Sequence, residues 1–312
     1  MIKVEEIEMQ YGSFKALNKV SFKVNKGEVV GLLGPNGAGK STTMKVLTTY
    51  LYPNAGKAYV DGLDVTEKPL EVRARIGYLP ELLPLYLDME VKDYLHFVAQ
   101  SRAIKKTRLT KRLDWVVEHL ELKPVYRKLC RELSKGFRQR VGLAQALIHD
   151  PDIVILDEPT SGLDPHQIQE IRALIRNLGK NKTVILSTHI LQEAQAVSDR
   201  IVIINRGRIV GDGTIEELQR QAHPVERTFV AIIGKKDDII ASLKDIDGGH
   251  EVLYLNDVDG YCNFEIRAQQ GRQIWKQIGA LCKEKGWQLG LLKDIPYSLE
   301  DTFMSLTKEE NL

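Results

Sequence analysis

Gly34-Pro35-Asn36-Gly37-Ala38-Gly39-Lys40-Ser41 decides the fold class that we predict for this chain. The stretch fits the pattern G-x-x-x-x-G-K-[ST] and stands between an apolar run, Glu28 to Leu33, and a helix-like stretch from Ser41 to Leu51. The order strand, glycine loop, helix is the setting in which this pattern binds phosphate. Backbone N–H groups of such a loop face one anion, and the positive end of the following helix attracts it further. We therefore predict that the chain binds ATP or GTP.

The lysine and the serine of this loop have distinct predicted tasks. Lys40 is expected to reach the terminal phosphates, and Ser41 is expected to be a ligand of Mg²⁺. A glycine loop before a helix can also be a tight turn without a ligand, but the Lys40-Ser41 pair and the strand described next argue against that interpretation. The other predicted nucleotide contacts of the loop are Gly34, Asn36, Gly37, Gly39 and Thr42.

A second apolar run, Ile153 to Leu156, leads into two carboxylates, Asp157 and Glu158. Such a run is typical of a buried parallel strand. Because neighbouring residues of a strand point to opposite sides, we expect Asp157 to bind the metal ion while Glu158 activates the attacking water. Carboxylates are also common helix caps, and Pro159-Thr160 follows, so capping of the next helix is the alternative.

Three further segments accompany the loop and the carboxylate strand. Leu133-Ser134-Lys135-Gly136-Phe137-Arg138-Gln139-Arg140 precedes that strand, Ser161-Gly162-Leu163-Asp164 follows it, and the apolar run Thr183 to His189 ends in a histidine. Together the five segments resemble the ATP-binding subunits of ABC transporters, over about residues 2 to 220. In that family they are the Walker A loop, signature motif, Walker B strand, D-loop and switch histidine.

The resemblance implies a nucleotide site shared with a second ATPase subunit, a copy of this chain or a close relative. Ser134 and the Gly136 N–H would contact the γ-phosphate bound to the opposite subunit, and Asp164 is a further expected nucleotide contact. His189 would contact the γ-phosphate and is predicted to be catalytic with Glu158. Taken alone, Ser134 before a helix is an ordinary N-cap, and a lone histidine is usually structural.

An aromatic residue near the N-terminus completes the predicted nucleotide site. Tyr11 stands where the family uses an aromatic side chain to stack on adenine. Packing within a sheet or exposure on the surface is the alternative for this tyrosine.

Two motifs depart from the family pattern, at three positions. Lys135 and Phe137 replace the usual residues of Leu-Ser-Gly-Gly-Gln, and Lys135 either adds charge near phosphate or is solvated. Glu81 stands where the family usually has a metal-contacting glutamine, so it either binds Mg²⁺ through oxygen or leaves the ion to Ser41 and Asp157. Both departures resemble the export branch that pairs with ABC-2 membrane subunits, including gliding-motility-associated and drug or ion extrusion systems.

The pattern of the first 221 residues predicts an α/β domain, and the resemblance implies that this domain is the P-loop NTPase core of an ABC ATPase. Alternating runs from Ile2 to about Phe22, and the stretch Gly56 to Gly62, predict a small antiparallel sheet in front of a parallel one. A helical period from about 84 to 148 predicts an inserted helical subdomain, with helices at Val91 to Ala99, Lys111 to Leu120 and Gly136 to Leu147.

Residues 222–312 are predicted to form an accessory α+β domain of ferredoxin-like order, β-α-β-β-α-β. A further helix is expected to start at Ser298, whose hydroxyl can cap the N–H of Asp301. Trp275, Ile278 and Leu281 fall at helical spacing and are expected to be core. The predicted elements are strand Arg227 to Ile233, helix Lys236 to Lys244, strands Glu251 to Asn256 and Tyr261 to Arg267, helix Gly271 to Lys285 and strand Trp287 to Lys293.

Composition narrows the class of partner. The 312 residues carry 44 Lys and Arg against 42 Asp and Glu, a formal charge of +2, which argues against nucleic acid as a partner.

No apolar run approaches the ~20 residues of a membrane-spanning helix, and no secretory leader pattern is present, so we expect a cytoplasmic chain. Cys130, Cys262 and Cys282 lack the spacing of a zinc site or a disulfide framework.

The resemblance predicts an ATP hydrolase that dimerises head-to-tail on ATP and drives export through a separate ABC-2-type membrane subunit, on the inner face of the cell membrane. A soluble ABC-type ATPase of translation or DNA repair is the alternative, but the chain carries a single Lys40-type loop and no sustained heptads. A regulator that binds nucleotide without hydrolysing it fits poorly with Glu158 and His189 both present.

Overall fold

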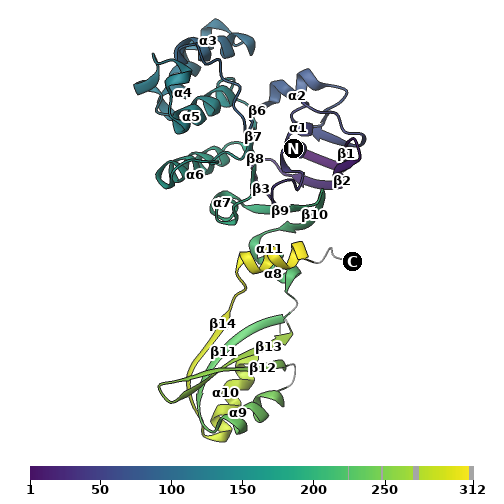
Figure 1. The fold of residues 1–312 in the computed structure, drawn as a ribbon, viewed down its shortest axis with the longest axis vertical. Helices are drawn as coiled ribbons and strands as arrows, with labels where there is room; N and C mark the ends of the chain where they lie inside the picture. Colours follow the sequence, from purple (N-terminus) through teal and green to yellow (C-terminus); the bar gives the residue numbers. More distant parts are fainter. Residues whose placement is uncertain (224, 247–248, 270–273, 309–312) are drawn as a thin grey trace. The chain divides into compact units, whose positions relative to one another are not determined.

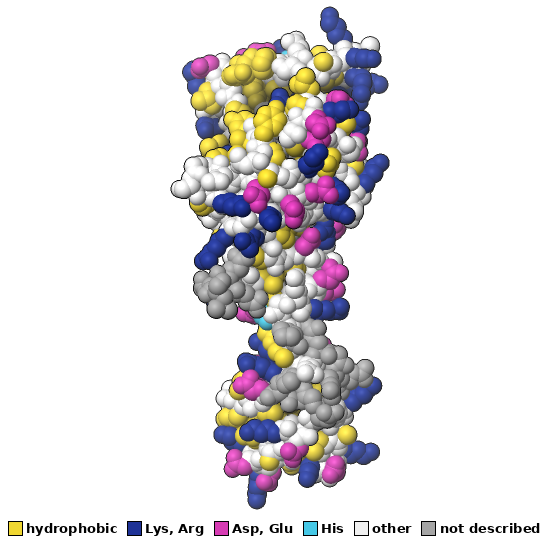
Figure 2. Space-filling model, turned by 90° about the vertical axis from the view of Figure 1, so that its right-hand side faces the viewer, with side chains coloured by type: hydrophobic (Ala, Val, Ile, Leu, Met, Phe, Trp, Pro, Cys, Tyr) yellow, Lys and Arg dark blue, Asp and Glu magenta, His cyan; other side chains and the backbone are white. Residues whose placement is uncertain are grey.

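The computed structural model describes residues 1–223, 225–246, 249–269 and 274–308. The chain divides into two compact units, Met1–Ile215 and Glu216–Leu312, and each has its own sheet and buried core. Figure 1 shows the course of the chain through both units. On the face drawn in Figure 2, dark blue and magenta side chains are interspersed on each unit, in keeping with the near-neutral charge.

A six-stranded sheet forms the centre of the first unit. Its inner strands are apolar and fully buried, as expected for parallel strands covered on both faces. All neighbours in it are parallel except β10 and β9, which pair antiparallel. In spatial order the strands are β10 (Arg208–Gly213), β9 (Arg200–Asn205), β3 (Val29–Leu33), β8 (Thr183–Thr188), β7 (Ile153–Asp157) and β6 (Ile76–Leu79).

One face of this sheet packs against the predicted antiparallel front sheet, with α1 (Lys40–Leu47) and α2 (Pro69–Arg75) in the same layer (Figure 1). The helix expected to reach Leu51 ends at Leu47 because Thr49 adopts a left-handed φ of 61° and turns the chain. The front strands, in spatial order, are β2 (Phe14–Val24), β1 (Ile2–Tyr11), β4 (Ala55–Val60) and β5 (Leu63–Asp64).

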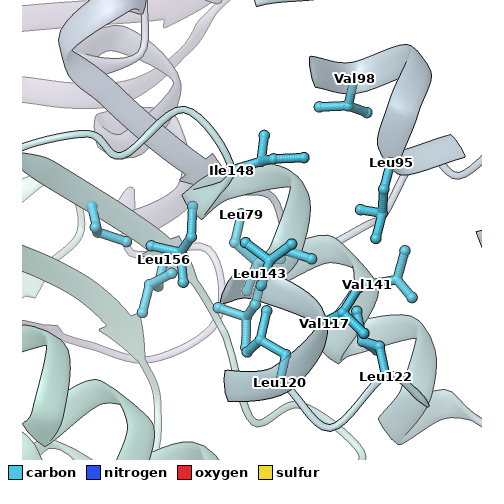
Figure 3. Packing of buried hydrophobic residues seen from close by; sticks show 14 of the residues in the cluster. Leu79, Leu95, Val98, Val117, Leu120, Leu122, Val141, Leu143, Ile148 and Leu156 are labelled. Atoms are coloured by element: carbon cyan, nitrogen blue, oxygen red, sulfur yellow. The ribbon is translucent and has the colours of Figure 1, made fainter. Parts of the chain in front are cut away.

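Helices cover the opposite face and form the predicted helical group. Val141 and Leu143 of α5 pack with residues of α4, while Leu156 of β7 and Leu79 of β6 belong to the same apolar cluster (Figure 3). α5 therefore joins the helical group to the central sheet. The helices are α3 (Val91–Ser101), α4 (Lys106–His119), the 3₁₀ turns Lys123–Val125 and Cys130–Glu132, α5 (Lys135–Leu147), α6 (Pro165–Gly179) and α7 (Leu191–Val197).

The second unit has the predicted ferredoxin-like arrangement. Its four strands lie in the order β12, β13, β11, β14, with every neighbouring pair antiparallel, and α9 and α10 contribute to one apolar core with the sheet. The elements are α8 (Ile215–Ala222), β11 (Val225–Ile233), α9 (Lys236–Lys244), β12 (Gly249–Val258), β13 (Tyr261–Gln269), α10 (Ile274–Lys285), β14 (Gln288–Ile295) and α11 (Leu299–Lys308).

Details of this unit test three predictions. The Ser298 hydroxyl accepts the Asp301 N–H at 3.0 Å, which confirms the cap of α11. Ile278 is fully buried and Leu281 packs against the core, but Trp275 is 48% exposed, so its placement in the core was wrong. The predicted helix start at Gly271 lies outside the described residues.

Two properties of the described chain bear on its surroundings. Within the described ranges, no helix combines the length and the apolar character that crossing a bilayer requires. Cys130, Cys262 and Cys282 are free thiols in buried positions, and burial raises the pKa of each thiol.

Candidate nucleotide site

The glycine loop follows β3 at the carboxyl edge of the central sheet, where it borders a cavity of about 470 Å³. Gly39 has a φ of 110°, and a Cβ there would come within 2.8 Å of the Ala16 carbonyl oxygen, so a side chain cannot be accommodated. A Cβ on Gly34 would approach the Ile204 carbonyl oxygen to 2.2 Å. The loop is therefore held against its neighbours by backbone contact. Asn36, Gly37, Gly39, Lys40, Ser41 and Thr42 all line the cavity.

Lys40 lies buried beneath this loop. Its Nζ donates to the carbonyl oxygens of Gly34 at 2.8 Å and Pro35 at 3.2 Å, and it lies 3.3 Å from Glu158 Oε1. The predicted phosphate-binding lysine and the predicted catalytic carboxylate, far apart in the sequence, are thus an ion pair at the cavity.

Ser41 and Asp157 meet as predicted for two metal ligands. The Ser41 hydroxyl donates to Asp157 Oδ1 at 3.1 Å, and Ser187 of β8 donates to the same oxygen at 2.5 Å. A carboxylate and a hydroxyl are hard oxygen donors of the kind that Mg²⁺ takes, so the residues present fit that ion. Glu81, which follows β6, lines the same cavity.

Burial dominates the electrostatics of Asp157. Its carboxyl is 1% exposed, and this burial raises its pKa above the ordinary range, while the hydroxyls of Ser187 and Ser41 act in the opposite direction. The neighbouring carboxylate of Glu158 raises the pKa further. Two acidic groups at one strand end therefore form a place where a cation is favourable.

Glu158 and His189 form the second functional pair. His189 Nδ1 lies 2.9 Å from Glu158 Oε2, and both residues line the cavity. The strand ends at Asp157, and Glu158 adopts a left-handed φ of 48°, with its N–H donated to the Ser187 hydroxyl at 2.9 Å. The expected divergence of the two carboxylates is present, but it comes from this turn of the backbone and not from strand alternation.

Aromatic side chains also line the cavity. Tyr11 lines it and is 46% exposed. Phe14, which pairs with Tyr11 across the β1–β2 turn, lines the same cavity and is 60% exposed. The sequence analysis did not identify Phe14, although an aromatic residue two positions after Gly12 in a hairpin was a usable indication.

Ser134, Gly136 and Asp164 lie at helix starts. The Ser134 hydroxyl caps α5 by accepting the Phe137 N–H at 3.3 Å, and Asp164 caps α6 by accepting the Gln167 N–H at 3.0 Å. A Cβ on Gly136 would come within 2.6 Å of the Gln167 side chain, so the two helix starts are packed together. Their contact with a nucleotide on another subunit stays a prediction.

The structure bears on the two alternatives for Lys135, which were added charge near phosphate and a solvated side chain. The side chain is exposed, and its Nζ lies so close to Gly162 that a Cβ there would come within 1.9 Å of it. The ammonium therefore rests on the loop between β7 and α6.

Comparisons with known proteins identify the family of this chain. A family model described as ABC transporter matches residues 17–161. The chain is 33% identical to the uncharacterized ABC transporter ATP-binding protein YxlF of Bacillus subtilis, over 98% of this chain and 99% of that one. It is 39% identical to the daunorubicin resistance ATP-binding protein DrrA3 of Streptomyces coeruleorubidus, over 70% of each chain.

A solved structure of a related ATP-binding cassette has a similar fold. It is the dimeric post-hydrolysis state of the ATP-binding cassette MJ0796 bound to ADP and Pi, with a TM-score of 0.63 and 25% identity over 69% of this chain and 98% of that one. The chain therefore belongs to the ABC transporter family, as one of its ATP-binding and ATP-hydrolysing subunits.

Proposed function

We propose that this chain hydrolyses Mg-ATP as the ATPase subunit of an exporter and works on a separate ABC-2-type membrane subunit at the inner face of the cell membrane. Two copies, or this chain and a close relative, close head-to-tail on the nucleotide. The observation that carries the proposal is the meeting of Lys40, Glu158 and His189 at one cavity beside the Ser41–Asp157 pair. A relative named for daunorubicin resistance supports export as the direction.

The chemistry follows from the two pairs. The loop N–H groups and Lys40 would hold the β- and γ-phosphates, and Tyr11 would stack on the base. Mg²⁺, held by Ser41 and Asp157, would neutralise charge on the phosphates. Glu158 would accept a proton from the attacking water. The oxygen of that water would bond to the γ-phosphorus, and the bond between the γ-phosphorus and the β,γ-bridging oxygen would break. His189 would orient Glu158 and contact the γ-phosphate.

The dimer is supported by the solved relative, which is itself dimeric. In the proposal, Ser134 and the Gly136 N–H at the start of α5, with Asp164, contact the γ-phosphate held by the opposite subunit. The nucleotide then becomes part of the interface, and its hydrolysis weakens that interface.

A further cavity of the first unit supports a protein partner. Its volume is about 960 Å³, with Tyr86, Tyr94 and Phe97 among its apolar lining residues. No carboxylate lines it among the described residues, and Asp150 nearby pairs with two of the arginines. We propose that a segment of the membrane subunit with apolar and acidic side chains binds here. The basic lining residues are Arg73, Arg102, Lys105, Arg108 and Arg112.

The first test is Glu158→Gln. Removing the proton acceptor should lower the rate of ATP hydrolysis by roughly 10²-fold or more while ATP still binds, because general-base catalysis contributes that much. Phosphate release and the ATP dissociation constant would be measured on the same preparation, with Glu170→Gln, a carboxylate paired with Arg140, as control. Full hydrolysis by Glu158→Gln would contradict the assigned role.

The second test separates the transporter from the soluble ABC-type ATPases. The tagged chain would be isolated from its own cells after gentle solubilisation of membranes. A stoichiometric membrane protein is the expected companion, whereas ribosomes or DNA would overturn the transporter assignment.

A further inference from the structure

A buried carboxylate outside the cavity lies behind the catalytic pair. Glu193 of α7 is 3% exposed, and its Oε2 accepts hydrogen bonds from Thr160 Oγ1 at 2.5 Å and from Thr188 Oγ1 at 2.9 Å. Both hydroxyls are themselves buried. A charged group so far from water is costly unless it is hydrogen-bonded, so this oxygen holds both threonines firmly.

The two threonines belong to the two segments that carry the chemistry. Thr160 lies two residues after Glu158, and Thr188 directly precedes His189. Thr188 Oγ1 also accepts the Ile190 N–H at 3.0 Å, which fixes the turn around the histidine. A single carboxylate oxygen thus joins the chain after β7 to the last residue of β8.

The geometry on the cavity side depends on that junction. Glu158 has a left-handed backbone, which persists only where its surroundings hold it. Its Oε2 must stay 2.9 Å from His189 Nδ1 for the pair to exist. Misplacement of a catalytic group by about 1 Å can lower a rate by roughly 10²-fold.

We propose that Glu193 is a positioning residue for ATP hydrolysis: it sets the distance between Glu158 and His189 by clamping Thr160 and Thr188. This inference rests on the proposed function of the site. Glu193 does not touch the nucleotide, so its loss should reduce turnover and leave ATP affinity unchanged.

The main variant is Glu193→Ala, with Glu193→Gln as the conservative partner. The alanine variant should lose about tenfold or more in kcat with an unchanged ATP dissociation constant. The glutamine variant keeps an oxygen that can accept both hydroxyls and should retain most of the activity. Thr188→Val removes one hydroxyl donor, so its kcat should lie between the values of wild type and Glu193→Ala. It replaces Glu193→Ala as the test variant if the alanine variant does not fold.

A matched control separates positioning from stability. Glu28 is a partly buried carboxylate directly before β3, at the end of that strand away from the glycine loop. It accepts hydrogen bonds from Arg200 Nε and the Asn25 N–H at 2.7 Å each. Glu28→Gln should lower the melting temperature with little change in kcat. Equal losses of kcat in Glu28→Gln and Glu193→Ala, or equal losses in Glu193→Gln and Glu193→Ala, would overturn the proposal.

A readout independent of turnover keeps the two proposals apart. The ring resonances of His189 in isotope-labelled protein should shift in Glu193→Ala and stay unchanged in Glu28→Gln. Unshifted resonances in Glu193→Ala count against the clamp, whatever the turnover. If the resonances shift in Glu193→Ala but the wild-type chain hydrolyses no Mg-ATP, the clamp would be retained and the proposed function refuted.

Discussion

Single residues at the strand ends determine which carboxylate of the site faces the proposed metal ligands and which faces Lys40 and His189. Asp157 turns toward Ser41 and Ser187, while Glu158 turns toward Lys40 and His189, although the two carboxylates are consecutive. The left-handed φ of Glu158 makes this possible, because it redirects the chain immediately after the strand. One group can thus serve a cation while the other serves water.

The proposed stacking of the base gives a prediction for Phe14, which lines the cavity with Tyr11. Phe14→Ala and Tyr11→Ala should each raise the ATP dissociation constant about fivefold or more, since stacking of a base on an aromatic ring contributes ~1–3 kcal/mol. Binding of inorganic tripolyphosphate should stay unchanged, because it has no base. Tyr52→Ala, an aromatic residue of similar exposure outside the cavity lining, is the control. Unaltered ATP affinity in Phe14→Ala would exclude its contact with the base.

His149 gives a prediction for pH. Burial, with the charges of Arg102, Arg112 and Lys182, lowers the pKa of His149 to about 4. Its Nε2 donates to the Ile76 carbonyl oxygen at 3.0 Å, and its buried Nδ1 has no partner among the described residues, so a second ring proton is unfavourable.

The sign of the effect follows from proton binding. Between the unfolded pKa of about 6.5 and the folded pKa, the unfolded chain binds more protons, so stability falls as pH decreases. The loss should be on the order of 1–3 kcal/mol. Urea unfolding at about pH 7 and pH 5 measures it. His149→Gln should show a smaller difference between the two pH values, and an equal difference would contradict the assignment.

At the scale of elements, α5 links the two functional regions of the first unit. Its N-terminal end carries Ser134 and Gly136, and its middle packs Val141 and Leu143 in the core shared by the helical group and β7 (Figure 3). The cavity of about 960 Å³ is lined by residues of α2, α3, α4 and α5. In the proposal, movement of a partner segment there is transmitted through packed side chains to the start of α5, which we propose contacts the second nucleotide.

The basic lining of that cavity gives the element-scale prediction. Lys105→Glu with Arg108→Glu should reduce the amount of membrane subunit that copurifies, because both side chains are exposed and would repel an acidic segment. ATP binding should be unchanged. Lys92→Glu, an exposed residue of α3 that does not line the cavity, should leave copurification intact. Undiminished copurification of the double variant would place the partner elsewhere.

For the whole molecule, the central question is how ATP changes assembly. Ser134, Gly136 and Asp164 at the starts of α5 and α6 do not line the nucleotide cavity. In the proposal, a second subunit therefore brings a helix start to the phosphate.

Light scattering gives the whole-molecule prediction. Glu158→Gln with saturating Mg-ATP should sediment and scatter as a dimer, because bound triphosphate persists at the interface. Chelation of Mg²⁺ or Lys40→Ala should return it to the monomer. A monomer under saturating nucleotide, with the membrane partner present, would rule out the shared site.

How far the sequence leads can be seen from particular residues. The spacing from Gly34 to Ser41, the carboxylates after Ile153 to Leu156, and His189 after its strand were enough to predict the family and the meeting of these groups. Those motifs are local, and the carboxyl ends of parallel strands must share one edge of the sheet. The β-α-β-β-α-β order of the second unit followed in the same way from local periodicity.

Other features were decided only by tertiary structure. The left-handed turn at Glu158 and the exposure of Trp275 depend on neighbours distant in the chain. Glu193 is an extreme case, since it occupies an unremarkable position in a short helix and acquires its contacts from the ends of two strands. Local sequence determined which chemical groups stand at strand ends, whereas long-range packing determined where they point, because burial and hydrogen bonding are properties of the folded neighbourhood.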